Sequence, residues 1–325
     1  MEEQVFHNRV DLNDLQHAVS SIKAEVGKII VGQDDMIELL IAAILADGHV
    51  LIEGVPGVAK TLTAKLLSKT MAIGFSRIQF TPDLMPSDII GTSIFNLKTS
   101  EFEFKKGPLF SNIILIDEIN RAPAKTQSAL FEAMEERQIT VDGKTYPLTA
   151  PFMVLATQNP IEHEGTYRLP EAQLDRFIFK IEVDYPSLED EIKIISEYHF
   201  RKNTVDINSV NEVINAANVK DFRVKVASLH IDTNLISYIA KIVNQTRNNS
   251  SIYLGASPRA SLAILSTAKA IAAIRGRDFV TPDDIKFVAA PVLNHRIMLT
   301  PEKEMEGISS KDVIKQIIEQ IEVPR

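Results

Sequence analysis

The stretch 51-LIEGVPGVAKTLTAKLL-67 places apolar residues before a loop of small residues, and a lysine–threonine pair after it opens an apolar-periodic segment. This pattern predicts a strand, a tight loop and the start of a helix. Small loop residues let a ligand approach the backbone, and the N–H groups at a helix N-terminus favour anions. The stretch therefore predicts a phosphate-binding loop. The alternative is an ordinary strand-to-helix turn with a solvated lysine.

The loop differs at one position from the phosphate-loop template G-x-x-x-x-G-K-[ST]. Gly54, Lys60 and Thr61 match the template, whereas Ala59 replaces its second glycine. Alanine has the smallest side chain after glycine, and Gly57 can supply the freest torsions. In this interpretation Lys60 reaches the β and γ phosphates and the Thr61 hydroxyl binds Mg²⁺.

Composition places the chain among ordinary globular proteins. Its 325 residues suffice for two domains, with 45% hydrophobic and 24% charged residues. Lys and Arg total 35 against 43 Asp and Glu, a net charge of −8, so generic attraction to nucleic acid or anionic membrane is not expected. The absence of cysteine excludes disulfides, thiolate nucleophiles and zinc–thiolate sites.

Neither the N-terminus nor any apolar run indicates a membrane protein. The start MEEQVFHNRV is acidic and polar, unlike a signal sequence, and the longest unbroken apolar run, 39–46, is far too short to span a bilayer. We therefore expect a cytoplasmic location without membrane insertion.

Apolar periodicity predicts an α/β architecture. Spacings of three and four residues predict helices over 11–29 and 35–46. Continuous apolar runs separated by helical segments are typical of a parallel sheet that is buried on both faces. The predicted strands are 49–52, 77–80, 112–116, 152–157 and 177–183.

A change of pattern near residue 187 predicts a domain boundary. Strand signals nearly stop there and helical periodicity continues, which predicts an αβα domain over 1–186 and a smaller helical domain over 187–325. Two hairpins, 92–104 and 138–148, interrupt the first domain; Asp142-Gly143 is a strong hairpin signal. Such insertions are free to carry contacts, and decorative loops are the alternative.

A second chemical signal is 113-IILIDEINRA-122, a buried strand that ends in two carboxylates. Ligands in open α/β sheets bind beyond the carboxyl ends of the strands, so Asp117 and Glu118 are expected to face the crevice of Lys60. Asp117 would bind Mg²⁺ and Glu118 would polarise the attacking water. Alternatively, both only begin the next helix. The order of the two motifs favours ATP binding.

Three further residues are candidates because of what their side chains can do. Asn159, at the end of the strand 152-FMVLATQNP-160, could hydrogen-bond the attacking water or the γ-phosphate; a turn-forming Asn-Pro is the alternative. Arg176 and Arg259 could each stabilise charge on a transferring phosphoryl group. The alternative for Arg176 is a structural ion pair, and the alternative for Arg259 is a side chain exposed to solvent. Ser257 and Pro258 predict that Arg259 lies in a first helical turn.

Taken in order, GVPGVAKT, LIDEINRAPAKTQSALFEAMEE, ATQNP, GTYRLPEAQLDRF and GASPRA resemble the MoxR family of AAA+ ATPases over nearly the whole chain. The resemblance implies that Asp117 and Glu118 are Walker B, Asn159 is sensor 1, Arg176 is the arginine finger and Arg259 is sensor 2 on the lid. It also implies that the hairpins are the helix-2 insert and the pre-sensor-1 hairpin. The nucleotide-binding residues would be Val31 and Gly32, against the adenine, and the Walker A segment with its neighbour: Gly54, Val55, Pro56, Gly57, Val58, Ala59, Lys60, Thr61 and Leu62.

Two positions depart from the family pattern. Arg168 stands where proline is usual, and His163 where glutamine is usual. Arg168 therefore competes with Arg176 as the arginine that crosses to a neighbouring subunit. Arg259 is expected to link the γ-phosphate to the lid, so that hydrolysis changes the angle between domains around residues 184–187.

The resemblance implies a Mg²⁺-dependent ATPase that works as a homo-oligomeric ring, expected to be a hexamer, and remodels or matures a partner protein. Such chaperones often act with a protein that carries a von Willebrand factor A-like domain, and sometimes insert a metal cofactor. One alternative is a nucleic-acid motor, against which the acidic chain argues. Another is a nucleotide-binding scaffold without turnover, which conflicts with the joint presence of Glu118, Asn159, Arg176 and Arg259.

Overall fold

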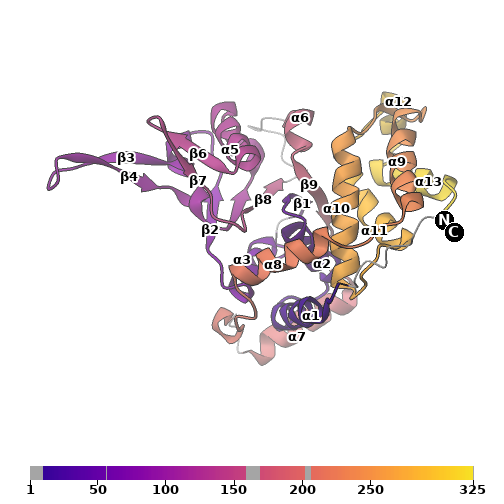
Figure 1. Ribbon diagram of the computed structural model, residues 1–325, viewed down its shortest axis with the longest axis horizontal. Coiled ribbons are helices and arrows are strands. Elements are labelled where there is room, and N and C mark those ends of the chain that lie inside the picture. The colour runs from indigo at the N-terminus through magenta and orange to yellow at the C-terminus, as the bar shows by residue number, and fades with distance from the viewer. Residues whose placement is uncertain (1–9, 56, 159–168, 202–205, 325) are drawn as a thin grey trace, which may run out of the picture.

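A parallel sheet organises the chain in the computed structural model, which describes residues 10–55, 57–158, 169–201 and 206–324. Within these residues it has five strands in the order β2-β5-β8-β1-β9, each parallel to its neighbours (Figure 1). All five predicted strands are confirmed, with ends shifted by one or two residues. Their bounds are β1 His49–Gly54, β2 Phe75–Gln79, β5 Ile113–Asp117, β8 Met153–Gln158 and β9 Phe177–Val183.

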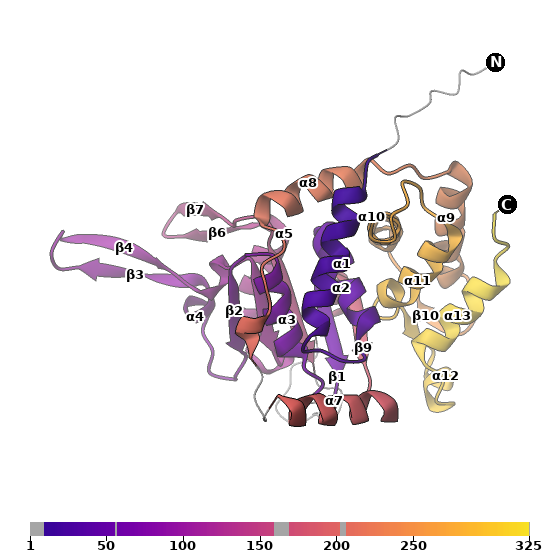
Figure 2. The same cartoon turned by 90° about the horizontal axis from the view of Figure 1, so that it is seen from below.

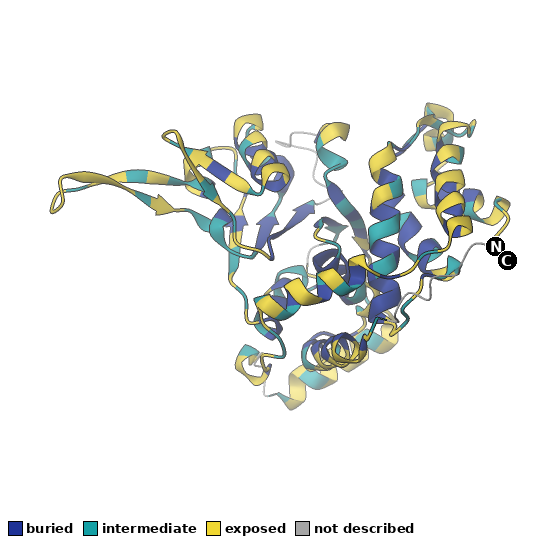
Figure 3. Cartoon of the chain, viewed as in Figure 1, coloured by how far each residue is buried: buried dark blue, intermediate teal, exposed yellow. Residues whose placement is uncertain are grey.

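Helices cover both faces of the sheet because alternate strand residues point to opposite sides. Ile113 and Leu115 pack in one apolar cluster with α1, α2 and α3, whereas Ile114 and Ile116 pack in another with α4 and α5. Figure 3 shows the strands as mostly buried. The bounds of these helices are α1 Asn13–Gly27, α2 Asp34–Leu45, α3 Lys60–Thr70, α4 Pro86–Ile90 and α5 Ala124–Glu136, and those of the short turns are η1 Pro108–Phe110 and η2 Ile119–Arg121.

Both predicted hairpins are present. Strands β3 (Gly91–Asn96) and β4 (Glu101–Lys106) pair antiparallel and project away from the sheet (Figure 1). Strands β6 (Gln138–Val141) and β7 (Lys144–Pro147) form the second hairpin around a turn in which Asp142 and Gly143 both have positive φ. Such angles are what a two-residue hairpin turn requires, which explains the sequence signal.

Helices dominate after residue 187, as predicted. Helix α7 lies beyond the end of β1, while α10 and α11 lie beside α2 and β9 (Figure 2). No helix among the described residues is long and apolar enough to cross a membrane. The bounds in this part are α6 Glu171–Leu174, α7 Leu188–Phe200, η3 Ile207–Ser209, α8 Ala216–Ala227, α9 Thr233–Arg247, β10 Ile252–Leu254, α10 Pro258–Ile274, α11 Pro282–Leu293, β11 Met298–Leu299, α12 Pro301–Met305 and α13 Ser310–Gln320.

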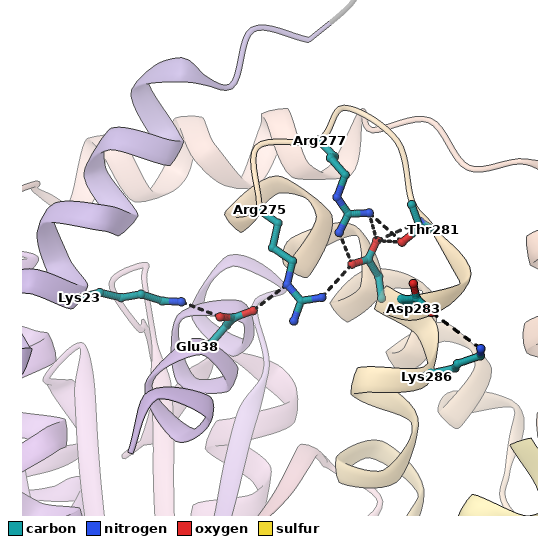
Figure 4. Close-up of polar contacts among 8 residues, drawn as sticks. Lys23, Glu38, Arg275, Arg277, Thr281, Asp283 and Lys286 are labelled. Atoms are coloured by element: carbon teal, nitrogen blue, oxygen red, sulfur yellow. Dashed lines mark hydrogen bonds and ion pairs between the residues drawn. The ribbon is translucent and has the colours of Figure 1, made fainter. Parts of the chain in front are cut away.

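A chain of ion pairs joins the C-terminal helices to the N-terminal ones (Figure 4). Glu38 on α2 binds Lys23 on α1 at 2.6 Å and Arg275 beyond α10 at 3.1 Å. Arg275 and Arg277 both reach Asp284 on α11, at 3.4 and 2.6 Å, and the Asp284 side chain is fully buried. One apolar cluster also spans both parts of the chain. The division at residues 186/187 therefore stays a proposal.

His49 joins three elements at the amino end of β1. Its Nδ1 accepts a hydrogen bond from the Val154 N–H at 2.9 Å, and its Nε2 lies 3.2 Å from the Met134 carbonyl on α5. The first contact needs an unprotonated Nδ1, so the neutral ring with its proton on Nε2 satisfies both partners. Burial lowers the pKa of His49 from its ordinary 6.5 to about 3, and Arg137 adds to the shift.

This burial makes the stability of the protein sensitive to acid. Between pH 6.5 and about 3, His49 is protonated in the unfolded chain but stays neutral in the folded protein. The free energy of unfolding should therefore fall with decreasing pH in that window, by up to about 1.4 kcal/mol per pH unit for this side chain. His49→Asn, which cannot titrate, should reduce that slope in urea unfolding measured at several pH values. An unchanged slope would show that His49 does not carry the effect.

Candidate functional site

The phosphate loop leaves the carboxyl end of β1 and enters α3, as the opening sequence predicts. A Cβ on Gly54 would lie 2.4 Å from the Val183 carbonyl oxygen, so the adjacent strand requires glycine there. Lys60 is the first residue of α3 and its Nζ donates to the Gly54 carbonyl at 2.8 Å, which places the ammonium over the loop. The helix N-terminus and the ammonium together favour an anion at this point. Pro56 lies outside the described residues.

Ala59 takes the backbone conformation that the template assigns to glycine. Its φ is +56°, in the left-handed region, and Gly57 has φ +88°. Left-handed geometry costs a residue with a Cβ about 1–2 kcal/mol. The loop therefore keeps the glycine-like geometry at position 59 despite the substitution, at the expense of backbone strain.

A cavity of about 320 Å³ adjoins the loop and is mostly apolar. Val31, a predicted adenine contact, forms part of its wall, whereas Gly32 lines a neighbouring cavity. Gly32 has φ +71°, and a Cβ there would lie 2.5 Å from the Asp190 side chain, so glycine lets α7 approach. Size and polarity suit a purine ring. The wall also includes Ile29, Ile30, Gln33, Val58, Leu62, Tyr185, Ile194 and Tyr198.

Helix α7 was missed as part of this cavity. Ile194 and Tyr198 stand four residues apart, a spacing that puts both on one helix face. This spacing was the only sequence signal for a contact between α7 and the cavity. A helix that packs on its own domain shows the same spacing. Gln33 was missed too: its amide donates to the Val58 carbonyl at 2.8 Å, which ties the start of α2 to the loop.

The carboxylate of Asp117 faces the same crevice. Asp117 ends β5, and its Oδ2 pairs with Arg77 at 2.6 Å while its Oδ1 lies 3.3 Å from the Thr157 hydroxyl. Burial lowers the pKa of the Lys60 ammonium, and the nearby carboxylates of Asp117 and Glu53 oppose that shift. The two sequence motifs are therefore neighbours in the fold, as predicted.

Glu118 is held in a specific orientation next to Asp117. Its φ of +57° is rare for a residue with a Cβ, and such outliers cluster at functional sites. Its N–H donates to the Thr157 hydroxyl at 3.2 Å. Its carboxylate accepts from Gln79 at 2.9 Å and pairs with Arg121 at 3.0 Å. Sequence analysis did not single out Gln79, Arg121 or Thr157, since each reads as an ordinary polar residue at a strand end or turn.

Oxygen donors suited to Mg²⁺ stand on either side of the phosphate loop. Thr61 is the second residue of α3, and Asp117 ends β5, which lies next to the strand pair β8-β1 in the sheet. Hydroxyl and carboxylate oxygens are the ligands that Mg²⁺ prefers, usually with waters and substrate phosphates. The Arg77 side chain on Asp117 is 54% exposed, so a divalent cation could replace it without burying a free guanidinium. Thr61 and Asp117 thus fit the ion, which would supply Lewis-acid charge to the phosphates.

Arg176 lies at the other end of the sheet. It directly precedes β9, whose first residue, Phe177, pairs with His49 at the start of β1. The six residues of β1 rise about 3.3 Å each, so this point lies about 17 Å from Gly54. The Arg176 guanidinium donates to the Phe131 carbonyl and stands over the Phe131 ring, 5.9 Å from its centroid. Arg176 cannot reach the phosphate loop of its own chain.

Arg259 lies beside Arg176, away from the phosphate loop of its own chain, and its expected link to the γ-phosphate stays a prediction. Both arginines pair with Glu135, Arg259 at 3.0 Å and Arg176 at 3.8 Å, and both line a cavity with His49. Arg259 is the second residue of α10, as its capping sequence predicts. The sequence shows the cap, but not the edge of the sheet to which α10 brings it. Asn159 and Arg168 lie outside the described residues.

Comparisons with known proteins agree with this geometry. Residues 49–179 match the family model described as "ATPase family associated with various cellular activities (AAA)", and residues 244–317 match an AAA lid domain. The chain is 46% identical to protein YeaC of Bacillus subtilis, over 96% of each chain. It is 44% identical to Chaperone MoxR1 of Mycobacterium tuberculosis, over 95% of this chain and 83% of that one. A crystal structure from Cytophaga hutchinsonii superposes with a TM-score of 0.88 at 46% identity, over 96% of this chain and 97% of that one.

The strain at Ala59 is testable. Ala59→Gly should raise the free energy of unfolding or leave it unchanged, because relief of about 1–2 kcal/mol of left-handed strain opposes the greater entropy of an unfolded glycine. Ala59→Val should lower it and weaken ATP binding, because a β-branched residue is disfavoured at positive φ. Urea denaturation and a fluorescent ATP analogue measure both effects. A stable valine variant with native affinity would contradict the φ assigned here.

Proposed function

The chain belongs to the MoxR family of AAA+ ATPases, and we propose that it hydrolyses MgATP as a ring of identical subunits that remodels a partner protein. One observation carries the ring: Arg176 and Arg259 lie about a strand's length from Lys60. A subunit alone therefore holds the phosphate loop and the acids without these arginines. A neighbouring subunit that presents its opposite edge would complete the site.

The roles of the described residues follow from their chemistry. Lys60 and the N-terminus of α3 hold the phosphates, while Thr61 and Asp117 hold Mg²⁺. Glu118 accepts a proton from the attacking water, and this requires its carboxylate to exchange Gln79 or Arg121 for that water. Arg176 and Arg259 of the adjacent subunit stabilise the charge that develops on the transferring phosphoryl group.

The hairpin β3–β4 supports a protein rather than a nucleic acid as the partner. Its exposed side chains include Phe95, Leu97 and Phe102, which are 45%, 85% and 73% exposed. Exposed apolar groups mark protein contacts, whereas nucleic-acid binding needs a surplus of basic groups that this acidic chain lacks. Four further parts of the proposal rest on the family resemblance alone. They are a partner with a von Willebrand factor A-like domain, the insertion of a metal cofactor, a hexameric ring and a cytoplasmic location.

Binding and chemistry should separate in two variants. Lys60→Ala should abolish ATP binding because the phosphates lose the charge at the loop. Glu118→Gln should bind ATP with native affinity but stop turnover, because only the proton acceptor is removed. Equilibrium binding of a fluorescent ATP analogue and release of phosphate measure the two properties. Wild-type turnover by Glu118→Gln would overturn the mechanism. The same variant, holding ATP, is the bait of choice for capturing the partner.

Mixing variants should show which residues come from the neighbour. Arg176→Ala should lower turnover by about 10³ to 10⁵ while each subunit still binds ATP. Its mixture with Lys60→Ala should regain activity, because the first variant offers intact pockets and the second offers intact arginines. Mixing Arg176→Ala with Arg259→Ala should restore nothing, because every donating edge then lacks one arginine.

The second mixture discriminates between the two positions for Arg259. If Arg259 served the pocket of its own chain, subunits with Arg176→Ala would provide complete pockets and subunits with Arg259→Ala would provide Arg176, so activity would return. Native subunits mixed with a tagged copy control for exchange. A dead first mixture despite exchange would exclude Arg176 as the donated arginine and make Arg168 the next residue to replace.

A further inference from the structure

Helix α7 has two apolar faces, of which only one is used within the chain. Ile194 and Tyr198 line the nucleotide cavity. At 100° per residue, Leu188, Ile192 and Ile195 form an adjacent face, about 110° around the helix from Ile194 and Tyr198, and are 74%, 56% and 63% exposed. None of the thirteen residues of α7, all of which the structure describes, is buried.

Further exposed apolar residues flank the outer stripe of α7, which is Leu188, Ile192 and Ile195. Tyr185, which precedes the helix and also lines the cavity, is 74% exposed, and Phe200 at the last position of the helix is 83% exposed. Figure 3 shows α7 as an exposed helix along one border of the molecule. Large apolar side chains that gather in this way mark an interaction site.

The neighbour's arginines identify what covers this stripe. In the proposed ring, Arg176 and Arg259 enter the nucleotide site from another copy of the chain. Since α7 forms a wall of the cavity, a copy that reaches that site comes next to α7. A second copy is therefore the occupant that the geometry favours.

Exposed apolar residues lie close to Arg259 in the sequence. Leu262 follows Arg259 by three residues on α10, so the two share a helix face, and Leu262 is 66% exposed. Tyr253 and Leu254 on β10, shortly before the helix, are 75% and 48% exposed. We refer to Tyr253, Leu254 and Leu262 as the α10 patch.

Charge distinguishes the two surfaces. The first turn of α7 carries three consecutive carboxylates, Glu189, Asp190 and Glu191. Next to the α10 patch, Arg176 and Arg259 share the single carboxylate of Glu135. An acidic rim would thus face a surface with a surplus of guanidinium groups, which favours a head-to-tail contact over contact between like surfaces.

We propose that the outer stripe of α7 docks on the α10 patch of a second copy of this chain. This inference rests on the proposed function, because the donated arginines fix which copy meets which. The contact joins two different surfaces, as ring closure requires. In this arrangement one face of α7 lines the nucleotide cavity and an adjacent face contacts the neighbouring subunit. A shift of α7 on nucleotide binding would therefore change the subunit interface directly.

Cysteine pairing tests this contact, because the chain has no cysteine of its own. Subunits with Ile195→Cys mixed with subunits with Leu262→Cys should form a disulfide-linked dimer on mild oxidation with an ATP analogue. Neither variant should form one alone. Val224→Cys, on an exposed position of α8, replaces Ile195→Cys in the control mixture. A dimer of Ile195→Cys alone, or no dimer from the mixture, would overturn the proposal.

A charge on the stripe tests the same contact by assembly. Ile192→Asp combined with Ile195→Asp should leave subunits that bind the fluorescent ATP analogue normally, but sediment as monomers and hydrolyse ATP about 10³-fold more slowly, since they lack donated arginines. Val224→Asp should assemble and turn over like the native chain. Circular dichroism confirms that both variants fold.

The outcomes separate this inference from the proposed function. If the aspartate variant assembles and hydrolyses ATP like the native chain, α7 is not the interface, although the ring stands. If the native chain neither assembles nor regains activity when Arg176→Ala and Lys60→Ala are mixed, the ring itself fails. If the aspartate variant loses ATP binding, the stripe supports the cavity rather than a neighbour, and the cysteine mixture yields no dimer.

Discussion

In a parallel sheet the carboxyl ends of all strands lie along the same edge, so the residues that follow β1, β5 and β8 gather there. Residues that precede β9 lie at the opposite edge, a strand's length away. This polarity brings Lys60 and Asp117 together from positions 57 residues apart in the sequence. It also keeps Arg176 at the opposite edge, opposite the start of β1. Because β1 is rigid and buried, no local movement brings Arg176 to the loop of its own subunit. The proposed division of the site between subunits follows from strand direction.

The ion-pair chain in the lid limits which parts of the molecule can respond to nucleotide. Rotation of all residues after 187 about the sheet would separate Arg275 from Glu38, whereas Asp284 would move together with Arg275 and Arg277. It would also divide the apolar cluster that spans both parts of the chain, and apolar burial contributes about 25 cal/mol per Å². Helix α7 is held less tightly, since none of its residues is buried in the described structure and its end is tied to the Lys28 carbonyl through Arg201. Movement that keeps the shared core intact is therefore easier for α7 alone than for the whole lid.

Sequence patterns predicted the sheet, the phosphate loop and the paired acids because each depends on neighbours along the chain. Apolar runs mark buried strands, and a carboxylate at a strand end has its edge fixed by strand direction. The positions of Arg259 and α7 depend instead on how distant segments pack. The cap at Ser257 and Pro258 predicted the start of α10, but which sheet edge α10 meets depends on the contacts of α10 with α1 and α2. Residues 159–168, which include two candidates, lie outside the described structure.

The geometry around Glu118 shows how the two acids respond together. Thr157 on β8 receives the Glu118 N–H and contacts the Asp117 carboxylate, so a single hydroxyl links the main chain of one acid to the side chain of the other. The Glu118 carboxylate is meanwhile engaged by Gln79 on β2. Since β2, β5 and β8 are adjacent in the sheet, a change at the ends of these strands would act on both acids at once. The left-handed backbone of Glu118 holds its carboxylate next to Gln79, and in the proposed mechanism the loss of this partner frees the carboxylate to accept a proton from water.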